Sequence, residues 1–203
     1  MARRTATWTV LVALTLTGTG RAEEPIDRAP LAVTIRTYDY ARVQPERVAL
    51  AQAFVARIYA DIGVSIRWGD TVDALSVLTG ALHVVPVIGP RDLVVMIQDP
   101  AMSRRWPLGS NIVGFAAAEH DAAGRIAYVL FDRVRHVAEW SQRREADVLG
   151  LVMAHEVGHL LGGAHSSVGL MRAEWPINDL RVDRGQFKFT RTEAECIRQS
   201  LRR

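Results

Sequence analysis

Three histidines near the middle of the second half of the chain have the spacing of a metal site. His155 and His159 are four positions apart, so on an α-helix both imidazoles lie on one face, one turn apart. Gly162 follows where that helix must stop, because a residue without a Cβ can take the left-handed conformation that reverses the chain. His165 can then return as a third ligand. Three imidazoles predict one bound Zn²⁺ ion with its fourth position open, as in catalytic rather than structural zinc sites.

A carboxylate stands beside the first of these ligands. Glu156 projects roughly 100° around the helix from His155. It can therefore face the cleft beside a metal without being a ligand, and there a general base can take a proton from a zinc-activated water. We expect Glu156 to be the catalytic residue of a zinc hydrolase.

The full pattern H-E-x-x-H-x-x-G-x-x-H spans residues 155–165, and Ser166 to Met171 follow it. This combination resembles the zinc motif and Met-turn of the metzincin-clan zinc metalloproteases. The strict resemblance covers only residues 155–171. It implies that Met171 is the methionine under the metal and that the chain cleaves peptide bonds. No tyrosine follows Met171, and in that respect the chain is similar to matrixins, as a minimal bacterial type.

The resemblance also implies which residues bind substrate. In metzincins an antiparallel edge strand lines the cleft and pairs with extended substrate, and an open strand edge offers backbone donors and acceptors to a peptide. The segment here that resembles this strand is Gly114, Phe115 and Ala116, for which an ordinary core strand is an equally open interpretation. The stretch after the Met-turn walls the pocket for the residue that follows the scissile bond. The corresponding residues are Arg172, Ala173, Glu174 and Trp175.

Hydrophobic periodicity predicts the elements that position this site. A helix with one apolar stripe begins at Pro45 and closes at Gly63, between two short strands, a connection that favours a parallel pair. A single long helix from Trp140 to Leu161 is expected to carry the first two ligands. Thr190 and Glu193 form a capping box that opens a final helix to about Leu201. The predicted strands are 31–38, 64–68, 92–98, 112–117 and 126–131, with a turn at 121–124 and weaker strand character at 82–87.

This order of elements predicts an α+β fold of the metzincin-like zincin type. We expect a mixed, mostly parallel twisted sheet with an antiparallel edge strand, a backing helix and an active-site helix. A small C-terminal subdomain should end in a helix. Residues 23–203 are interpreted as one peptidase domain, with an upper subdomain at about 31–162 and a lower subdomain at about 163–203.

The first 22 residues are interpreted as a signal peptide. A basic start at Arg3 and Arg4 precedes an apolar run that is too short to span a bilayer, and small residues precede a cleavage point after Ala22. The alternative is a membrane anchor or a buried N-terminal helix. Cleavage predicts an exported protein, periplasmic or extracellular, with no stable membrane insertion afterwards.

Charge and cysteine content exclude some functions. The leader holds three of the 25 basic residues and no acidic one, so the remainder has 22 of each sign. A nucleic-acid partner is therefore not expected. Cys196 is the single cysteine, so no internal disulfide can form, and we expect it to be a small buried apolar residue.

Three functions fit these observations. The first is a secreted zinc endopeptidase that acts on peptide or protein substrates, and a monomer is the expected state. The second is a non-catalytic exported module that binds zinc and peptide, although such a module has no need of Glu156. The third is a zinc hydrolase that acts on a non-protein substrate.

Overall fold

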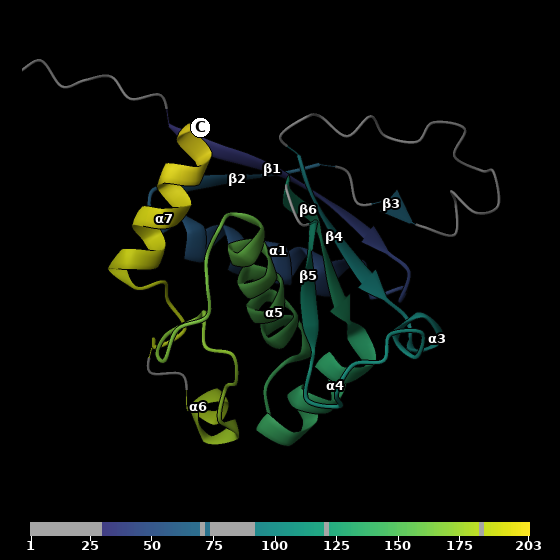
Figure 1. The fold of residues 1–203 in the computed structure, drawn as a ribbon. Helices are drawn as coiled ribbons and strands as arrows, with labels where there is room; N and C mark the ends of the chain where they lie inside the picture. Colours follow the sequence, from purple (N-terminus) through teal and green to yellow (C-terminus); the bar gives the residue numbers. More distant parts are fainter. Residues whose placement is uncertain (1–29, 70–71, 74–91, 120–121, 183–184) are drawn as a thin grey trace, which may run out of the picture.

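A computed structural model describes residues 30–69, 72–73, 92–119, 122–182 and 185–203 (Figure 1). The predicted signal peptide and the segment 82–87, with its weak strand character, lie outside the described residues. Within the described part of the chain, no helix combines the length and the apolar character needed to cross a membrane.

One mixed sheet forms the centre of the fold, with strand order β2-β1-β4-β6-β5. All neighbouring pairs are parallel except β5 with β6, which is antiparallel. The two-residue strand β3 (Val72–Asp73) adds to the end of β1. β5 is the last strand in this order, so the predicted antiparallel edge strand is confirmed. The strand bounds are β1 Leu31–Asp39, β2 Val64–Trp68, β4 Leu93–Gln98, β5 Gly114–Glu119 and β6 Ala122–Leu130.

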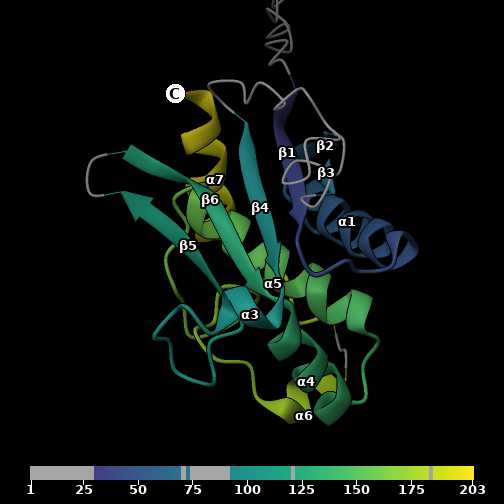
Figure 2. The same cartoon turned by 90° about the vertical axis from the view of Figure 1, so that its right-hand side faces the viewer.

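Two helices pack together against one face of this sheet (Figures 1 and 2). They are α1 (Pro45–Ala60) and α5 (Glu145–Leu160), which correspond to the predicted backing and active-site helices. Nearly every side chain of α5 is buried, because the helix lies between α1, the sheet and the segment that follows it. A helix that is apolar on all sides is expected in such a position.

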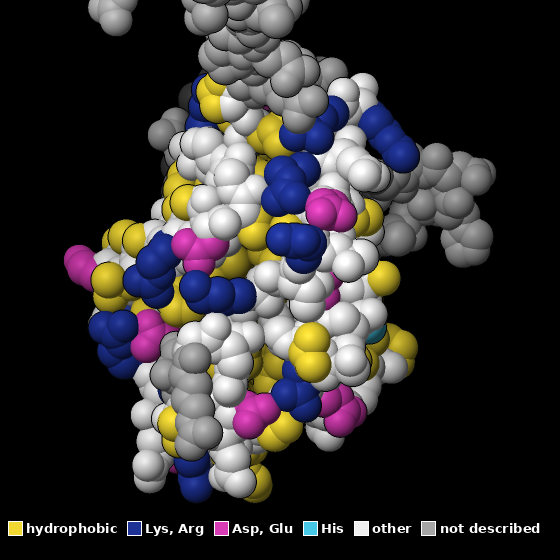
Figure 3. Space-filling model, turned by 90° about the vertical axis from the view of Figure 1, so that its left-hand side faces the viewer, with side chains coloured by type: hydrophobic (Ala, Val, Ile, Leu, Met, Phe, Trp, Pro, Cys, Tyr) yellow, Lys and Arg dark blue, Asp and Glu magenta, His cyan; other side chains and the backbone are white. Residues whose placement is uncertain are grey.

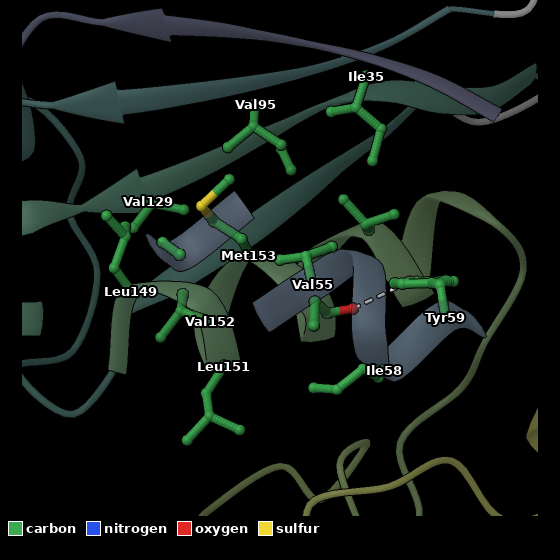
Figure 4. Close-up of a cluster of buried hydrophobic side chains, with 14 of the residues drawn as sticks. Ile35, Val55, Ile58, Tyr59, Val95, Val129, Leu149, Leu151, Val152 and Met153 are labelled. Carbon is green, nitrogen blue, oxygen red and sulfur yellow. Dashed lines mark hydrogen bonds between the residues drawn. The ribbon is translucent and has the colours of Figure 1, made fainter. Parts of the chain in front are cut away.

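The main core joins these layers (Figure 4). Val55 of α1 and Met153 of α5 are completely buried, as are Val95 and Val129 of the sheet. Tyr59 of α1 lies in the same core, and its hydroxyl donates a hydrogen bond of 3.0 Å to the carbonyl of Ala154 in α5, shown as a dashed line in Figure 4. The residue before the first histidine of the motif is thereby tied to the backing helix.

The prediction of one helix from Trp140 to Leu161 is wrong. The chain forms α4 (Phe131–Ser141), leaves helical geometry, and starts α5 at Glu145. Gln142 takes the left-handed conformation with φ 56° and donates its N–H to the carbonyl of Ala138, which ends α4. Glu145 then pairs with Arg47 of α1, and its negative charge favours the N-terminus of α5.

Two boundaries around β6 also differ from expectation. The predicted turn at 121–124 overlaps the strand, because β6 already begins at Ala122. At its other end β6 stops at Leu130, and Phe131 opens α4 instead of closing a strand. The strand pairing with β5 extends to Ala122, so backbone pairing overrides the turn preference of these small residues.

The C-terminal part has little regular structure until its last helix. It contains the short helix α6 (Ile177–Arg181), which was not predicted. The short helix α3 (Pro100–Ser103), which follows β4, was not predicted either. The capping box is confirmed, because Thr190 and Glu193 each bond the other's backbone N–H at the start of α7 (Arg191–Arg202). Ile197 of α7 lies in the main core, and the division into subdomains near residue 162 remains a prediction.

Figure 3 shows the face that carries α7 and α6. Basic and acidic side chains are interspersed on it, with apolar side chains between them. An ion pair joins Lys188 Nζ of the C-terminal part to Asp61 Oδ2 at 3.1 Å.

Candidate metal centre

The three motif histidines converge on one point. The Nε2 atom of His159 lies 3.0 Å from Nε2 of His155 and 3.1 Å from Nε2 of His165. All three ligand atoms lie within 4.8 Å of one another, a set able to hold a metal ion. α5 carries the first two rings on one face, as the spacing predicts. Gly162, with φ 85°, turns the chain so that His165 returns to them.

Hydrogen bonds fix which ring nitrogen of the two helical histidines, His155 and His159, is free to bind a metal. Nδ1 of His155 lies 2.9 Å from the carbonyl oxygen of Leu170, and Nδ1 of His159 lies 2.8 Å from that of Gly163. A carbonyl oxygen can only accept, so each Nδ1 carries the proton and each Nε2 keeps its lone pair. This is the arrangement in which the partner of one ring nitrogen prepares the other for a metal.

The surroundings also keep these rings neutral. The pKa of His155 is lowered to about 4, mainly by burial; the hydrogen bond to Leu170 opposes this shift, and the neighbouring His159 and His165 add to it. Burial likewise lowers the pKa of His159. Neutral imidazole is the form that binds a metal. Three converging imidazoles, two of them with oriented Nε2 lone pairs, therefore fit a zinc ion.

Glu156 lies in the same cleft and is only 5% exposed. Its side chain packs against the backbone of Gly114 at the start of β5. A Cβ at position 114 would lie 2.9 Å from Oε1 of Glu156 and 2.8 Å from Cγ1 of Val152. Burial raises the pKa of Glu156 to about 8. A nearby cation would favour its ionised form and lower that pKa.

Met171 lies against α5 between the turns that carry the first two ligands. It is completely buried. A Cβ at Gly158 would lie 2.6 Å from Sδ of Met171, so the helix approaches the methionine this closely only because position 158 has no side chain. The turn is closed by the N–H of Ser166, which donates to the carbonyl of Met171 at 2.9 Å. That Met171 is the methionine of a Met-turn remains a prediction.

A cleft of about 1360 Å³ surrounds these groups. It is bordered by the three histidines and by Glu156. The predicted substrate-binding residues also border it, namely Gly114, Phe115, Ala116, Arg172, Ala173, Glu174 and Trp175. Their contact with a substrate remains a prediction.

Several of these residues have contacts that specify their position. The ring of Phe115 stacks on Tyr128 with centroids 4.7 Å apart and also meets Trp106, on the face of the sheet away from Glu156. Arg172 forms an ion pair with Asp179 at 2.7 Å. The indole of Trp175 contacts the ring of His155. Glu174 accepts a hydrogen bond of 3.4 Å from Asn111, which also borders the cleft.

The sequence analysis missed the wall of the cleft that α4 and α6 provide. The lining residues from these helices are Asp132, Arg133, His136, Val137, Trp140, Ile177 and Leu180. His136 belongs to this wall. Its ring meets that of Trp140 at 5.1 Å, and the spacing of four between them on one helical face was the available signal.

Cys196 is exposed, so the expectation that it is buried is wrong. Its Sγ donates a hydrogen bond of 3.2 Å to the carbonyl of Gly162, at the end of the zinc motif helix. The buried side of α7 consists of Glu193, Ala194 and Ile197. Cys196 lies outside this buried side and therefore faces solvent.

Comparisons with known proteins agree with the fold. No family model matches this chain, and no curated protein sequence matches it significantly. Among solved structures, it is similar to archaemetzincin from Methanopyrus kandleri, with a TM-score of 0.53 and 15% sequence identity over 88% of this chain and 100% of that chain. The chain thus has a mixed α/β fold similar to that of archaemetzincin, and its three histidines could hold a metal ion such as zinc. The matrixin-like type remains a prediction.

Proposed function

We propose that this chain is a zinc-dependent endopeptidase of the metzincin type. His155, His159 and His165 hold one zinc ion, and Glu156 is the general base. One observation carries the proposal: three imidazoles with converging Nε2 atoms share a cleft with a buried carboxyl group. The similarity of the fold to archaemetzincin supports it.

Zinc held by three imidazoles supplies Lewis-acid chemistry, which polarises a carbonyl and lowers the pKa of water. Glu156 accepts a proton from the attacking water and later donates it to the leaving amine. The Leu170 and Gly163 carbonyls hold the two helical imidazoles in one tautomer while this happens. Burial of Glu156 keeps bulk water from competing for the proton.

The substrate that suits this cleft is an extended peptide. β5 lies at the edge of the sheet and borders the cleft, so its backbone can pair with a peptide by strand addition. Gly114, Phe115 and Ala116 form this edge, and residues 172–175 form the opposite wall. The apolar side chains that line the cleft from α4, α5 and α6 favour an apolar substrate residue.

We further propose that the protein is exported, with its mature chain beginning near Glu23, and acts in the periplasm or outside the cell. The support is the order of basic, apolar and small residues in positions 1–22. N-terminal sequencing of the exported protein tests this. Recovery of Met1 on that protein would contradict it.

The test of the function is cleavage by the mature chain, residues 23–203, of casein and of a peptide library. We expect cleavage that a chelator abolishes and added zinc restores. A protein that binds zinc stoichiometrically but cleaves nothing would be the non-catalytic peptide-binding module. A protein that hydrolyses esters or amides of small molecules but no peptide would be a hydrolase with a different substrate.

A further inference from the structure

The carbonyl oxygen of Leu170 is shared by two side chains. It accepts a hydrogen bond from Nδ1 of His155 at 2.9 Å and one from the indole Nε1 of Trp175 at 3.1 Å. A carbonyl oxygen has two lone pairs, so both bonds can form at once. The indole N–H of Trp175 is therefore directed at the same atom that orients the buried histidine of the motif.

Trp175 is held in place on both sides. Its ring meets that of His155 edge-on, with centroids 5.4 Å apart and planes at 87°. On another side it meets Phe187, with centroids 5.8 Å apart and planes at 77°. Phe187 is buried in the main core. The indole is thereby fixed by packing, and its N–H direction follows.

The carbonyl of Leu170 needs such support because it belongs to no helix or strand. Leu170 lies in a turn after Gly169, which has φ 74°. Its N–H donates to the carbonyl of Lys188 at 2.9 Å, which anchors one side of the residue. A second donor on the oxygen restricts rotation of the peptide group between Leu170 and Met171. Restricted rotation of that group restricts the ring of His155 in turn.

We propose that Trp175 is a positioning residue for the metal ligand His155, acting through the Leu170 carbonyl. This gives Trp175 a role beyond the pocket wall that its place in the sequence implies. The inference rests on the proposed zinc site. Partners behind a metal ligand typically change metal affinity by about 10- to 100-fold when they are removed, and loss of one neutral hydrogen bond should fall at the lower end.

The test is the zinc dissociation constant of Trp175→Phe, measured by competition with a chromophoric chelator. This variant keeps an aromatic ring but loses the N–H. We expect zinc to bind about 10-fold more weakly than to the wild type. Cobalt substitution adds a second readout, because a less restricted His155 should alter the visible absorption of bound Co²⁺.

Two controls separate hydrogen bonding from packing. Phe187→Leu loosens the packing of the Trp175 ring but keeps its N–H, so zinc should bind more weakly than to the wild type but more tightly than to Trp175→Phe. Trp140→Phe changes an exposed tryptophan elsewhere in the cleft and should leave zinc affinity unchanged. Thermal unfolding of each metal-free variant verifies that it is folded.

Each outcome decides between explanations. Unchanged or tighter zinc binding by a folded Trp175→Phe would overturn the positioning role, and so would an equal loss in Phe187→Leu. If Trp175→Phe does not fold, hydrogen exchange of the indole N–H in the wild type decides: the Trp175 N–H should exchange slowly, and exchange as fast as that of the exposed Trp140 would overturn the bond to Leu170. A wild-type protein that binds no zinc would overturn the metal site itself, and with it this inference.

Discussion

The carboxyl group of Glu156 lies directly against the backbone of Gly114, and this contact joins α5 to the edge strand β5. A Cβ at position 114 would lie 2.9 Å from Oε1 and 3.0 Å from Cγ of Glu156. Real Cβ atoms do not approach other atoms that closely, so the absence of a side chain at this position permits the observed place of Glu156. The proposed general base and the proposed substrate strand are thus one packed unit.

Gly114→Ala should therefore displace Glu156 without removing it. We expect turnover on a model peptide to fall by about 10²-fold, because a shift of about 1 Å in a catalytic group can cost that much. Zinc content should stay at one per chain, since no ligand changes. The control is Gly63→Ala, where the added Cβ meets nothing within 4 Å and only the backbone at φ 73° is strained. Turnover equal to the wild type would show that the contact does not position Glu156.

The raised pKa of Glu156 predicts a pH-dependent stability of the metal-free protein. In the unfolded chain this group ionises near its ordinary value of 4.5, and in the folded protein near 8. Between these values the folded state holds more protons, so the free energy of unfolding falls as the pH rises. Glu156→Gln cannot ionise and lacks this dependence. Its melting temperature relative to wild type should rise between pH 4.5 and pH 8 in the presence of chelator. Parallel melting curves across that range would contradict the burial of an ionisable Glu156.

Tyr59→Phe should lower the free energy of unfolding and leave the site intact. The variant removes one buried hydrogen bond, from the Tyr59 hydroxyl to the Ala154 carbonyl, which typically contributes about 0.5–1.5 kcal/mol. Denaturant titration measures the loss. Tyr128→Phe, on the other face of the sheet, is the control and should have little effect. If both variants unfold alike, the link between α1 and α5 is not stabilising.

Zinc binding should depend on each of the three motif histidines. His165→Ala removes one of three ligands and should reduce zinc content at micromolar metal to well below one per chain. His136→Ala is the matched control, because His136 borders the same cleft and its ring meets Trp140 instead of the triad. Full zinc occupancy in His165→Ala would remove His165 from the proposed ligand set.

The sequence predicts the parts of this site that depend on local spacing. His155 and His159 share a helical face because of a separation of four, and Gly162 allows His165 to return. The sheet order was predictable in outline, since a strand–helix–strand connection favours parallel pairing.

Other features of the site could not be predicted, because the sequence carries no local signal for them or because they depend on tertiary packing. The break between α4 and α5 uses Gln142 in a left-handed conformation, where glycine would have been the usual signal. The wall from α4 and α6 borders the cleft only through tertiary packing. The bond from Trp175 to Leu170 connects two residues outside helices and strands, for which no periodicity exists.

Cys196 could have been placed correctly, because the burial of Ala194 and Ile197 sets the inner face of α7.

The most direct test of the proposed function compares wild type with Glu156→Gln on one peptide at equal zinc loading. Glutamine keeps nearly the same shape but cannot accept a proton from water at neutral pH. We expect zinc content near one per chain in both proteins and turnover lower in the variant by about 10² to 10⁴-fold, the usual contribution of general acid–base catalysis. Equal turnover at equal zinc loading would contradict the assignment of Glu156 as the general base, and a large loss of zinc would make Glu156 a ligand.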